Sequence, residues 1–212
     1  MTKKLSEMTL EELWQLFPII LTEHSNHWRS YYLEEETALK RILPSNAIVN
    51  HIGSTAVPGI WAKPIVDILV EVEDEMLDSA AATLVRGGYI IMSRESLEVA
   101  NTRSHHAAEK LAESACVAAR IKRISLNKGY TEQGFANKVF HLHLRQYGDN
   151  AEIYFRDYLI AHPEVAKEYE SLKLSLWKMY EHNRDAYTQA KTEFVKKYTK
   201  LAKMKRNVAP KK

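Results

Sequence analysis

The spacing of apolar residues divides the chain into helical ends and a strand-rich middle. Apolar residues recur every three or four positions in several segments, which is typical of amphipathic helices. The helices predicted in this way cover residues 9–17, 26–43, 75–86, 151–161, 164–180 and 184–204. Strands are predicted for residues 47–52, 65–72, 89–92, 121–126 and 139–145. Strands that alternate with helices indicate an α/β or α+β fold with a small sheet.

The second predicted strand carries two carboxylates on one face. Its even positions are apolar, whereas its odd positions are Asp67, Leu69 and Glu71. A buried, charged aspartate costs several kcal/mol unless it pairs with a cation, a metal ion or hydrogen-bond donors. We therefore expect Asp67 to belong to a ligand site, with a structural ion pair to Lys63 or Arg145 as the alternative. Glu71 lies about 13 Å along the strand from Asp67, too far to share one metal ion.

The last predicted strand has the clearest alternation in the chain. One face is apolar, and the other carries His141, His143 and Arg145. The two histidines lie about 7 Å apart along the strand, a spacing that suits one metal ion or one phosphate group. This face is either the wall of a cleft or a solvated strand surface.

A phosphate-binding turn is predicted where the first strand ends. The strand runs into Gly53-Ser54-Thr55, and Lys63 follows in a loop that contains two prolines. Glycine lets a ligand approach the backbone closely, the hydroxyls and amides of Ser54 and Thr55 can bind phosphate, and Lys63 adds positive charge. Asp67 offers hard oxygen to a divalent cation such as Mg²⁺. The alternative is an ordinary turn in which Thr55 caps a backbone amide.

Composition limits the class of protein. The 212 residues suffice for one sizeable domain, and Cys116 is the only cysteine, so no intramolecular disulfide can form. No apolar run approaches the ~20 residues of a membrane span, and the N-terminus lacks the apolar segment of a signal peptide. These features favour a cytoplasmic protein without a membrane partner.

Basic residues are concentrated at the C-terminus. Eight lysines and arginines follow Glu193 with no acid among them. Because the net charge of the whole chain is only +3, the rest of the chain is mildly acidic. We interpret this tail as a solvated helix end that suits the helix dipole. A nucleic-acid partner is not expected, because aromatic residues do not interleave with these charges.

Four motifs follow one another along the chain. They are Gly53-Ser54-Thr55-Ala56-Val57-Pro58-Gly59 with Ala62-Lys63-Pro64-Ile65-Val66-Asp67-Ile68, then Lys128-Gly129-Tyr130-Thr131, then residues 134–145, and finally Tyr154-Phe155-Arg156-Asp157 with its continuation to residue 164. In this order they resemble the GrpB family of the nucleotidyltransferase superfamily. The resemblance implies a single domain, residues 1–212, with a mixed sheet of nucleotidyltransferase type. Residues 1–45 would be N-terminal helices, 46–149 the α/β core, and 150–212 C-terminal helices with a basic tail.

The resemblance also implies a reaction and a set of site residues. The reaction would transfer a nucleotidyl or phosphoryl group from a nucleoside triphosphate to a small acceptor with Mg²⁺. Asp67, His141 and His143 would be catalytic, with Asp67 and His143 as metal ligands. The ligand-binding residues would be Gly53, Ser54, Thr55, Lys63, Lys128, Arg145 and Arg156. For Lys128 and Arg156 a structural role is the alternative, with Arg156 paired to Asp157.

Two features depart from the family pattern. Leu69 occupies the position where active members of the superfamily carry a second carboxylate, and two-metal chemistry needs carboxylates between the ions. The alternative function is therefore a non-catalytic module that binds a nucleotide or a coenzyme-A-related ligand. Residues 95–120 contain no glycine or proline, and we expect them to form a helical insertion away from the cleft.

Overall fold

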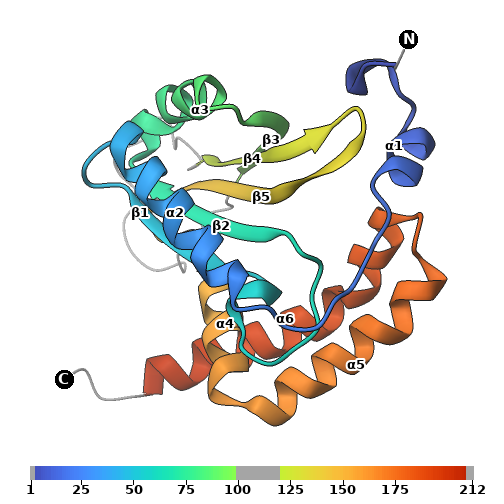
Figure 1. Cartoon of the computed structure of the whole chain (residues 1–212). Helices are drawn as coiled ribbons and strands as arrows, with labels where there is room; N and C mark the ends of the chain where they lie inside the picture. The colour runs from blue at the N-terminus through green and yellow to red at the C-terminus, as the bar shows by residue number, and fades with distance from the viewer. Residues whose placement is uncertain (1–2, 99–119, 209–212) are drawn as a thin grey trace, which may run out of the picture.

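A five-stranded mixed sheet organises the molecule. The computed structural model describes residues 3–98 and 120–208 (Figure 1). The order across the sheet is β1 (Ile48–Ile52), β2 (Val66–Val72), β5 (Gly134–Gln146), β4 (Arg120–Thr131) and β3 (Ile90–Glu98). Only the β2–β5 pair is parallel; the other three neighbouring pairs are antiparallel. The predicted α/β class with a small mixed sheet is confirmed.

Two helices cover one face of the sheet. They are α2 (His27–Ile42) and α3 (Leu77–Arg86), which follows a short 3₁₀ turn, η3 (Asp74–Met76). The apolar core between these helices and the sheet includes Val66, Ile68 and Leu142, all buried. The even positions of β2 therefore face the core, as predicted. Their burial leaves the odd positions to face the opposite side, because strand side chains alternate.

Three C-terminal helices form a second layer. They are α4 (Ala151–Ala161), α5 (Pro163–Met179) and α6 (Arg184–Val208), which lie together below the sheet in Figure 1. A second apolar cluster joins Val57 and Ile60, from the loop after β1, to residues such as Leu159 and Tyr169 on these helices. This packing fixes the predicted phosphate turn, which contains the 3₁₀ turn η2 (Ser54–Ala56), against the helical layer.

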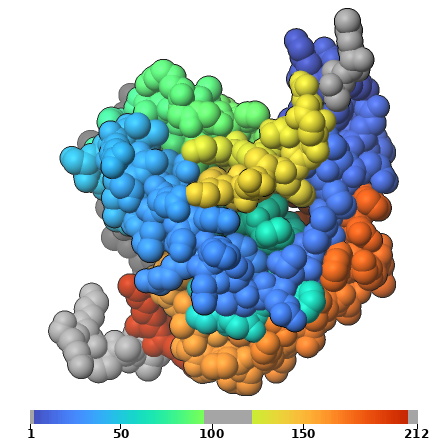
Figure 2. All heavy atoms as spheres, viewed as in Figure 1, coloured from blue at the N-terminus to red at the C-terminus, as the bar shows by residue number. Residues whose placement is uncertain are grey.

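An N-terminal segment links the two layers. After η1 (Leu5–Glu7), helix α1 (Leu10–Leu16) is capped by Thr9, which forms a capping box with Glu12. The following chain is hydrogen-bonded to both layers: the Ile19 N–H donates to the Glu181 carbonyl at 2.8 Å, and Thr22 pairs with Ala62. In the space-filling view it runs across the surface between the β4–β5 hairpin and the C-terminal helices (Figure 2).

Several element boundaries differ from the predictions. The strand predicted at residues 121–126 continues through residues 127–129 as part of β4, where Gly129 adopts a φ of 90° at a register shift. Residues 95–98 and 120, predicted as helix, belong to β3 and β4, which pair with each other. The rest of the predicted insertion lies outside the described residues. Among those described, no helix is long and apolar enough to cross a membrane.

Candidate ligand-binding site

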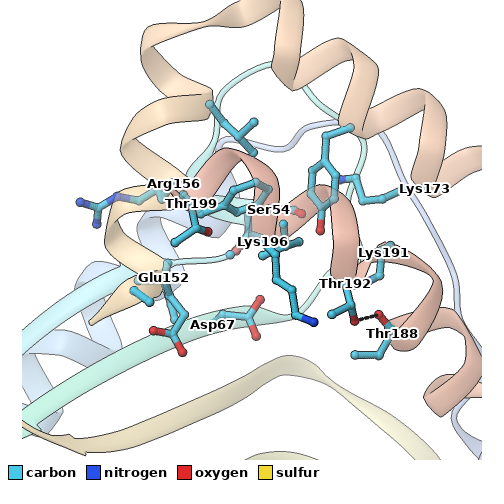
Figure 3. A pocket seen from close by; sticks show the side chains of 18 of the residues that line it. Ser54, Asp67, Glu152, Arg156, Lys173, Thr188, Lys191, Thr192, Lys196 and Thr199 are labelled. Atoms are coloured by element: carbon cyan, nitrogen blue, oxygen red, sulfur yellow. Dashed lines mark hydrogen bonds between the residues drawn. The ribbon is translucent and has the colours of Figure 1, made fainter. Parts of the chain in front are cut away.

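A cleft of about 860 Å³ lies between the polar face of the sheet and the C-terminal helices. Its lining comes from β2, β5, the turn after β1, and helices α4, α5 and α6. Figure 3 shows labelled residues from each of these except β5. This volume is within the range of small-molecule sites in proteins. The cleft opens on the side of the sheet that α2 and α3 leave uncovered.

Asp67 and two histidines occupy the floor of the cleft. The parallel register of β2 and β5 makes Asp67 the direct partner of His141. The Asp67 Oδ1 atom lies 3.3 Å from His141 Nδ1 and 3.9 Å from His143 Nε2. Burial alone would raise the pKa of Asp67, but hydrogen bonding to the two histidines outweighs it and leaves that pKa well below its usual value. Burial lowers the pKa of His141 to about 4, so its ring is neutral at pH 7.

Gly53 makes room for the Asp67 carboxylate. Gly53 has a φ of +71°, and a Cβ atom built there would stand 2.2 Å from Asp67 Oδ2. The sequence predicted that glycine here lets a ligand approach the backbone. The structure instead places the Asp67 side chain in that space. Glycine is required at this position for the packing of Asp67.

The walls of the cleft are strongly basic. Eight lysines and arginines line it against two carboxylates, Asp67 and Glu152, so its net charge is positive. Burial lowers the pKa of Lys63 to about 7, and repulsion from Arg184 and Lys191 acts in the same direction. Burial also lowers the pKa of Lys173 to about 7 and that of Lys191 to about 8. A bound anion would relieve both the burial cost and the repulsion.

The cleft also has an apolar section. It is lined by Phe155 and Leu159 on α4, Tyr169 on α5, and Val195 and Met204 on α6. Hydroxyls are available from Ser54, Thr188, Thr192 and Thr199. The cleft can therefore hold a molecule that combines anionic groups with an apolar or aromatic part.

Most of the predicted site residues come together in this cleft. Those that line it are Gly53, Ser54, Thr55, Lys63, Asp67, His141, His143 and Arg156. The Arg156 guanidinium points away from Asp67 in Figure 3, donates to the His51 carbonyl at 2.7 Å and pairs with Asp157. Thr55 is buried, with its hydroxyl 3.0 Å from His51 Nε2. The polar groups of Arg156 and Thr55 are thus engaged in contacts within the protein, which gives both residues a structural role.

Two predicted ligand-binding residues, Lys128 and Arg145, do not line the cleft. Lys128 is paired in register with Phe140 on the covered face of the sheet, and its ammonium donates to both carboxylate oxygens of Glu35 at 2.7 and 3.0 Å. Arg145 is buried next to His143 on the same face of β5, where it donates to the carbonyls of Ile124 and Leu144. The prediction that these side chains contact the ligand directly is not supported.

The sequence interpretation missed several cleft residues on the C-terminal helices. Lys173, Arg184 and Lys191 line the cleft, and so do the exposed tail residues Lys196, Lys200 and Lys203. The basic residues of the tail up to Arg206 are exposed, and three of them also face the cleft. A signal existed in α6, where threonines and lysines recur at three- and four-residue spacing: Thr188, Lys191, Thr192, Lys196, Thr199, Lys200 and Lys203.

The donor atoms do not fit the predicted magnesium site. Within residues 3–98 and 120–208, no group of three or more histidine, cysteine, aspartate or glutamate side chains is arranged to hold a metal ion. Leu69 supplies no oxygen, and the Glu71 carboxylate accepts hydrogen bonds from the Gly148 amide and the Asn150 side chain, both at 3.0 Å. Mg²⁺ prefers oxygen ligands, whereas the neighbours of Asp67 at the cleft floor are histidines. The assignment of Asp67 and His143 as metal ligands is therefore not supported.

Fold and site together define a mixed α/β protein with a basic ligand cleft, and its family follows from comparison with known proteins. A family model described as GrpB protein matches residues 18–201, and the chain belongs to this family. The glutamate-rich protein GrpB of Alkalihalophilus pseudofirmus is 34% identical over 183 residues, covering 84% of this chain and 91% of the relative. The UPF0157 protein YqkA of Bacillus subtilis is 27% identical over 210 residues, and the chain spans 53% of its length.

One solved structure agrees with this family assignment. The crystal structure of the conserved protein GrpB from Enterococcus faecalis is 32% identical, covers 88% of this chain and 99% of its own, and superposes with a TM-score of 0.65. A structure of the Cid1 poly(U) polymerase with Mg 3'-dATP bound is a more distant neighbour, at 14% identity and a TM-score of 0.42, covering 78% of this chain and 43% of its own.

Proposed function

We propose that this chain binds a phosphate-bearing small molecule, of the nucleotide or coenzyme-A-related class, in the cleft above Asp67. The observation that carries the proposal is the excess of basic side chains over carboxylates among the residues that line the cleft. Buried lysines with lowered pKa values are costly to keep charged, and an anionic ligand removes that cost.

The cleft divides into two parts that suit such a ligand. The phosphates would lie at the end formed by Lys63, Lys173 and Lys191, where Ser54 and the threonines of α6 add hydroxyl donors. The remainder of the ligand would lie along Phe155 and Val195. Asp67 attracts the ammonium groups of Lys63 and Lys191, which would place positive charge between this carboxylate and the phosphates.

Group transfer from a nucleoside triphosphate is the second candidate. It is favoured by the ordered cluster of Asp67, His141 and His143 at the cleft floor, since such side chains can move protons. We rank it below binding because Leu69 stands in place of a second carboxylate and Glu71 is engaged elsewhere. Any Mg²⁺ would enter with the phosphates of the nucleotide.

Calorimetric titration tests the proposal. Pyrophosphate, ATP, GTP and coenzyme A are each titrated into the protein, once with Mg²⁺ and once with EDTA. The Lys191→Met variant should bind at least about tenfold more weakly, a loss of about 1.4 kcal/mol. The Lys197→Met variant is the matched control, because Lys197 lies on the same helix but does not line the cleft.

Two outcomes of this experiment would change the proposed function. If none of the four compounds binds in the millimolar range, the proposed function is wrong. If ATP or GTP binds and pyrophosphate or inorganic phosphate is then released over time, the second candidate replaces simple binding. Release must be absent from the Asp67→Asn variant to be assigned to this site.

A further inference from the structure

The hydrogen bonds of His141 determine which of its ring nitrogens carries the proton. Arg184 Nη2 lies 3.0 Å from His141 Nε2 and 3.5 Å from Nδ1, and the Tyr130 hydroxyl lies 2.6 Å from the same Nε2. Asp67, whose pKa is lowered, is a carboxylate that can only accept, so the ring nitrogen facing it, Nδ1, must donate. Nε2 is then the acceptor, which agrees with its being the ring nitrogen nearer to the arginine donor. The neutral ring then carries its proton on Nδ1. This N–H faces Asp67 Oδ1 at 3.3 Å.

Tyr130 reinforces this arrangement. Arg184 Nη1 donates to the Tyr130 oxygen at 3.1 Å, which leaves the hydroxyl proton free to point toward His141 Nε2. The Tyr130 and His141 rings are also stacked, with centroids 5.8 Å apart. His141 is therefore held by two donors on one side and by Asp67 on the other.

His143 has the opposite tautomer, but it too directs its N–H group at Asp67. Arg145 Nη2 lies 3.3 Å from His143 Nδ1, and because an arginine can only donate, Nδ1 accepts and the ring proton is on Nε2. This nitrogen is the one directed at Asp67 Oδ1, at 3.9 Å. Both histidines thus direct an N–H group at the same carboxylate oxygen. The other oxygen, Oδ2, packs against Gly53.

We propose that Asp67, His141 and His143 form a metal-free cluster in which Arg184 and Arg145 are positioning residues that fix the histidine tautomers. A metal ion that bound the ring nitrogens facing Asp67 would have to displace their protons, and the arginines disfavour this because they donate to the other nitrogen of each ring, where those protons would otherwise go. Lysines then supply the positive charge that a metal ion would otherwise bring to a bound phosphate. Only this last step rests on the proposed function; the tautomers are a property of the ligand-free protein.

Histidine NMR tests the inference directly. Long-range ¹H–¹⁵N correlations of the ligand-free protein distinguish the two neutral tautomers of each ring. We expect His141 to be protonated on Nδ1 and His143 on Nε2. In Arg184→Met the Nδ1-protonated form of His141 should lose its dominance. Arg156→Met is the matched control, since its guanidinium binds the His51 carbonyl, and it should leave the His141 spectrum unchanged. A wild-type His141 protonated on Nε2 would overturn the inference.

Manganese addition provides an independent measurement. Mn²⁺ broadens the NMR signals of nearby nuclei, and we expect no selective broadening of the His141 and His143 ring signals in the ligand-free protein. Selective broadening of both rings that disappears in Asp67→Asn would show a metal site and contradict the proposal. Pyrophosphate binding in EDTA separates the two claims: its failure contradicts the proposed function, whereas the tautomers are judged by the NMR spectra alone.

Discussion

The Asp67 carboxylate fills the space beside Gly53 that any other residue would use for its side chain. A Cβ atom at Gly53 would stand 2.2 Å from Oδ2 and 2.8 Å from Cγ of Asp67. The backbone at Gly53, with φ 71° and ψ −172°, also lies in a region that only glycine adopts readily. The phosphate-type turn and the cleft floor are therefore one packed unit.

The first prediction concerns this contact. Gly53→Ala should lower the free energy of unfolding by about 3 kcal/mol or more, because backbone strain of about 1–3 kcal/mol is added to displacement of Asp67. Gly59→Ala is the matched control: Gly59 also has a positive φ, +73°, but nothing lies within 4 Å of its Cβ position. Gly59→Ala should lower the free energy of unfolding by only about 1–2 kcal/mol. Urea unfolding measures both, and equal costs would show that the contact with Asp67 is unimportant.

The second prediction concerns Lys128, which the sequence motif suggested as a ligand-binding residue. Its ammonium binds Glu35 on the covered side of the sheet, and Glu35 is buried. Lys128→Met should therefore leave pyrophosphate affinity unchanged and lower the free energy of unfolding by about 1–3 kcal/mol, because a buried carboxylate loses a charged partner.

Lys138→Met is the comparison for Lys128→Met. Lys138 pairs with Glu34, the neighbour of Glu35 on α2, but both side chains of this pair are exposed. Exposed ion pairs contribute about 0–1 kcal/mol, so this variant should unfold almost like the wild type. A loss of pyrophosphate affinity in Lys128→Met but not in Lys138→Met would show that Lys128 does bind the ligand.

The third prediction concerns Glu71, the second carboxylate on the polar face of β2. Its Oε2 atom accepts hydrogen bonds from the Gly148 amide and the Asn150 side chain. Glu71→Ala leaves both donors unpaired and should cost about 1–3 kcal/mol of unfolding free energy. Glu71→Gln keeps one oxygen acceptor for the same two donors and should restore most of that loss. A weakened affinity for ATP in Glu71→Gln, with stability retained, would contradict this structural role.

The polar floor of the cleft could be predicted because its signal is local. In β2 and β5 the side chains alternate with a period of two, so Asp67, His141 and His143 stand out from apolar neighbours in the sequence itself. Their juxtaposition depends on the parallel pairing of β2 with β5, which places Asp67 opposite His141. That pairing is non-local, and the alternation within each strand does not specify it.

The rest of the cleft could not be predicted in the same way. Lys173 and Arg184 come from helices whose packing against the sheet, not their sequence, makes these side chains part of the cleft lining. Lys128 failed as a prediction because Gly129 forms a register shift inside a long strand and does not end it. A glycine after an asparagine and a lysine has the same local preference in a turn and in a bulge, and only the partner strand distinguishes them.

The last prediction concerns the pH dependence of stability. Burial lowers the pKa of Lys173 to about 7 in the folded protein, from an ordinary value of 10.5. Between pH 7 and about 10 the unfolded chain therefore binds more protons than the folded chain, so the free energy of unfolding should rise with pH in this interval. Lys63 and Lys191, with pKa values of about 7 and 8, contribute in the same sense.

Urea unfolding at pH 7, 8 and 9 should show a smaller rise in the free energy of unfolding for Lys173→Met than for the wild type. Lys178→Met, an exposed lysine on the same helix, should retain the wild-type rise. An identical slope in Lys173→Met and Lys178→Met would mean that Lys173 stays protonated throughout this interval.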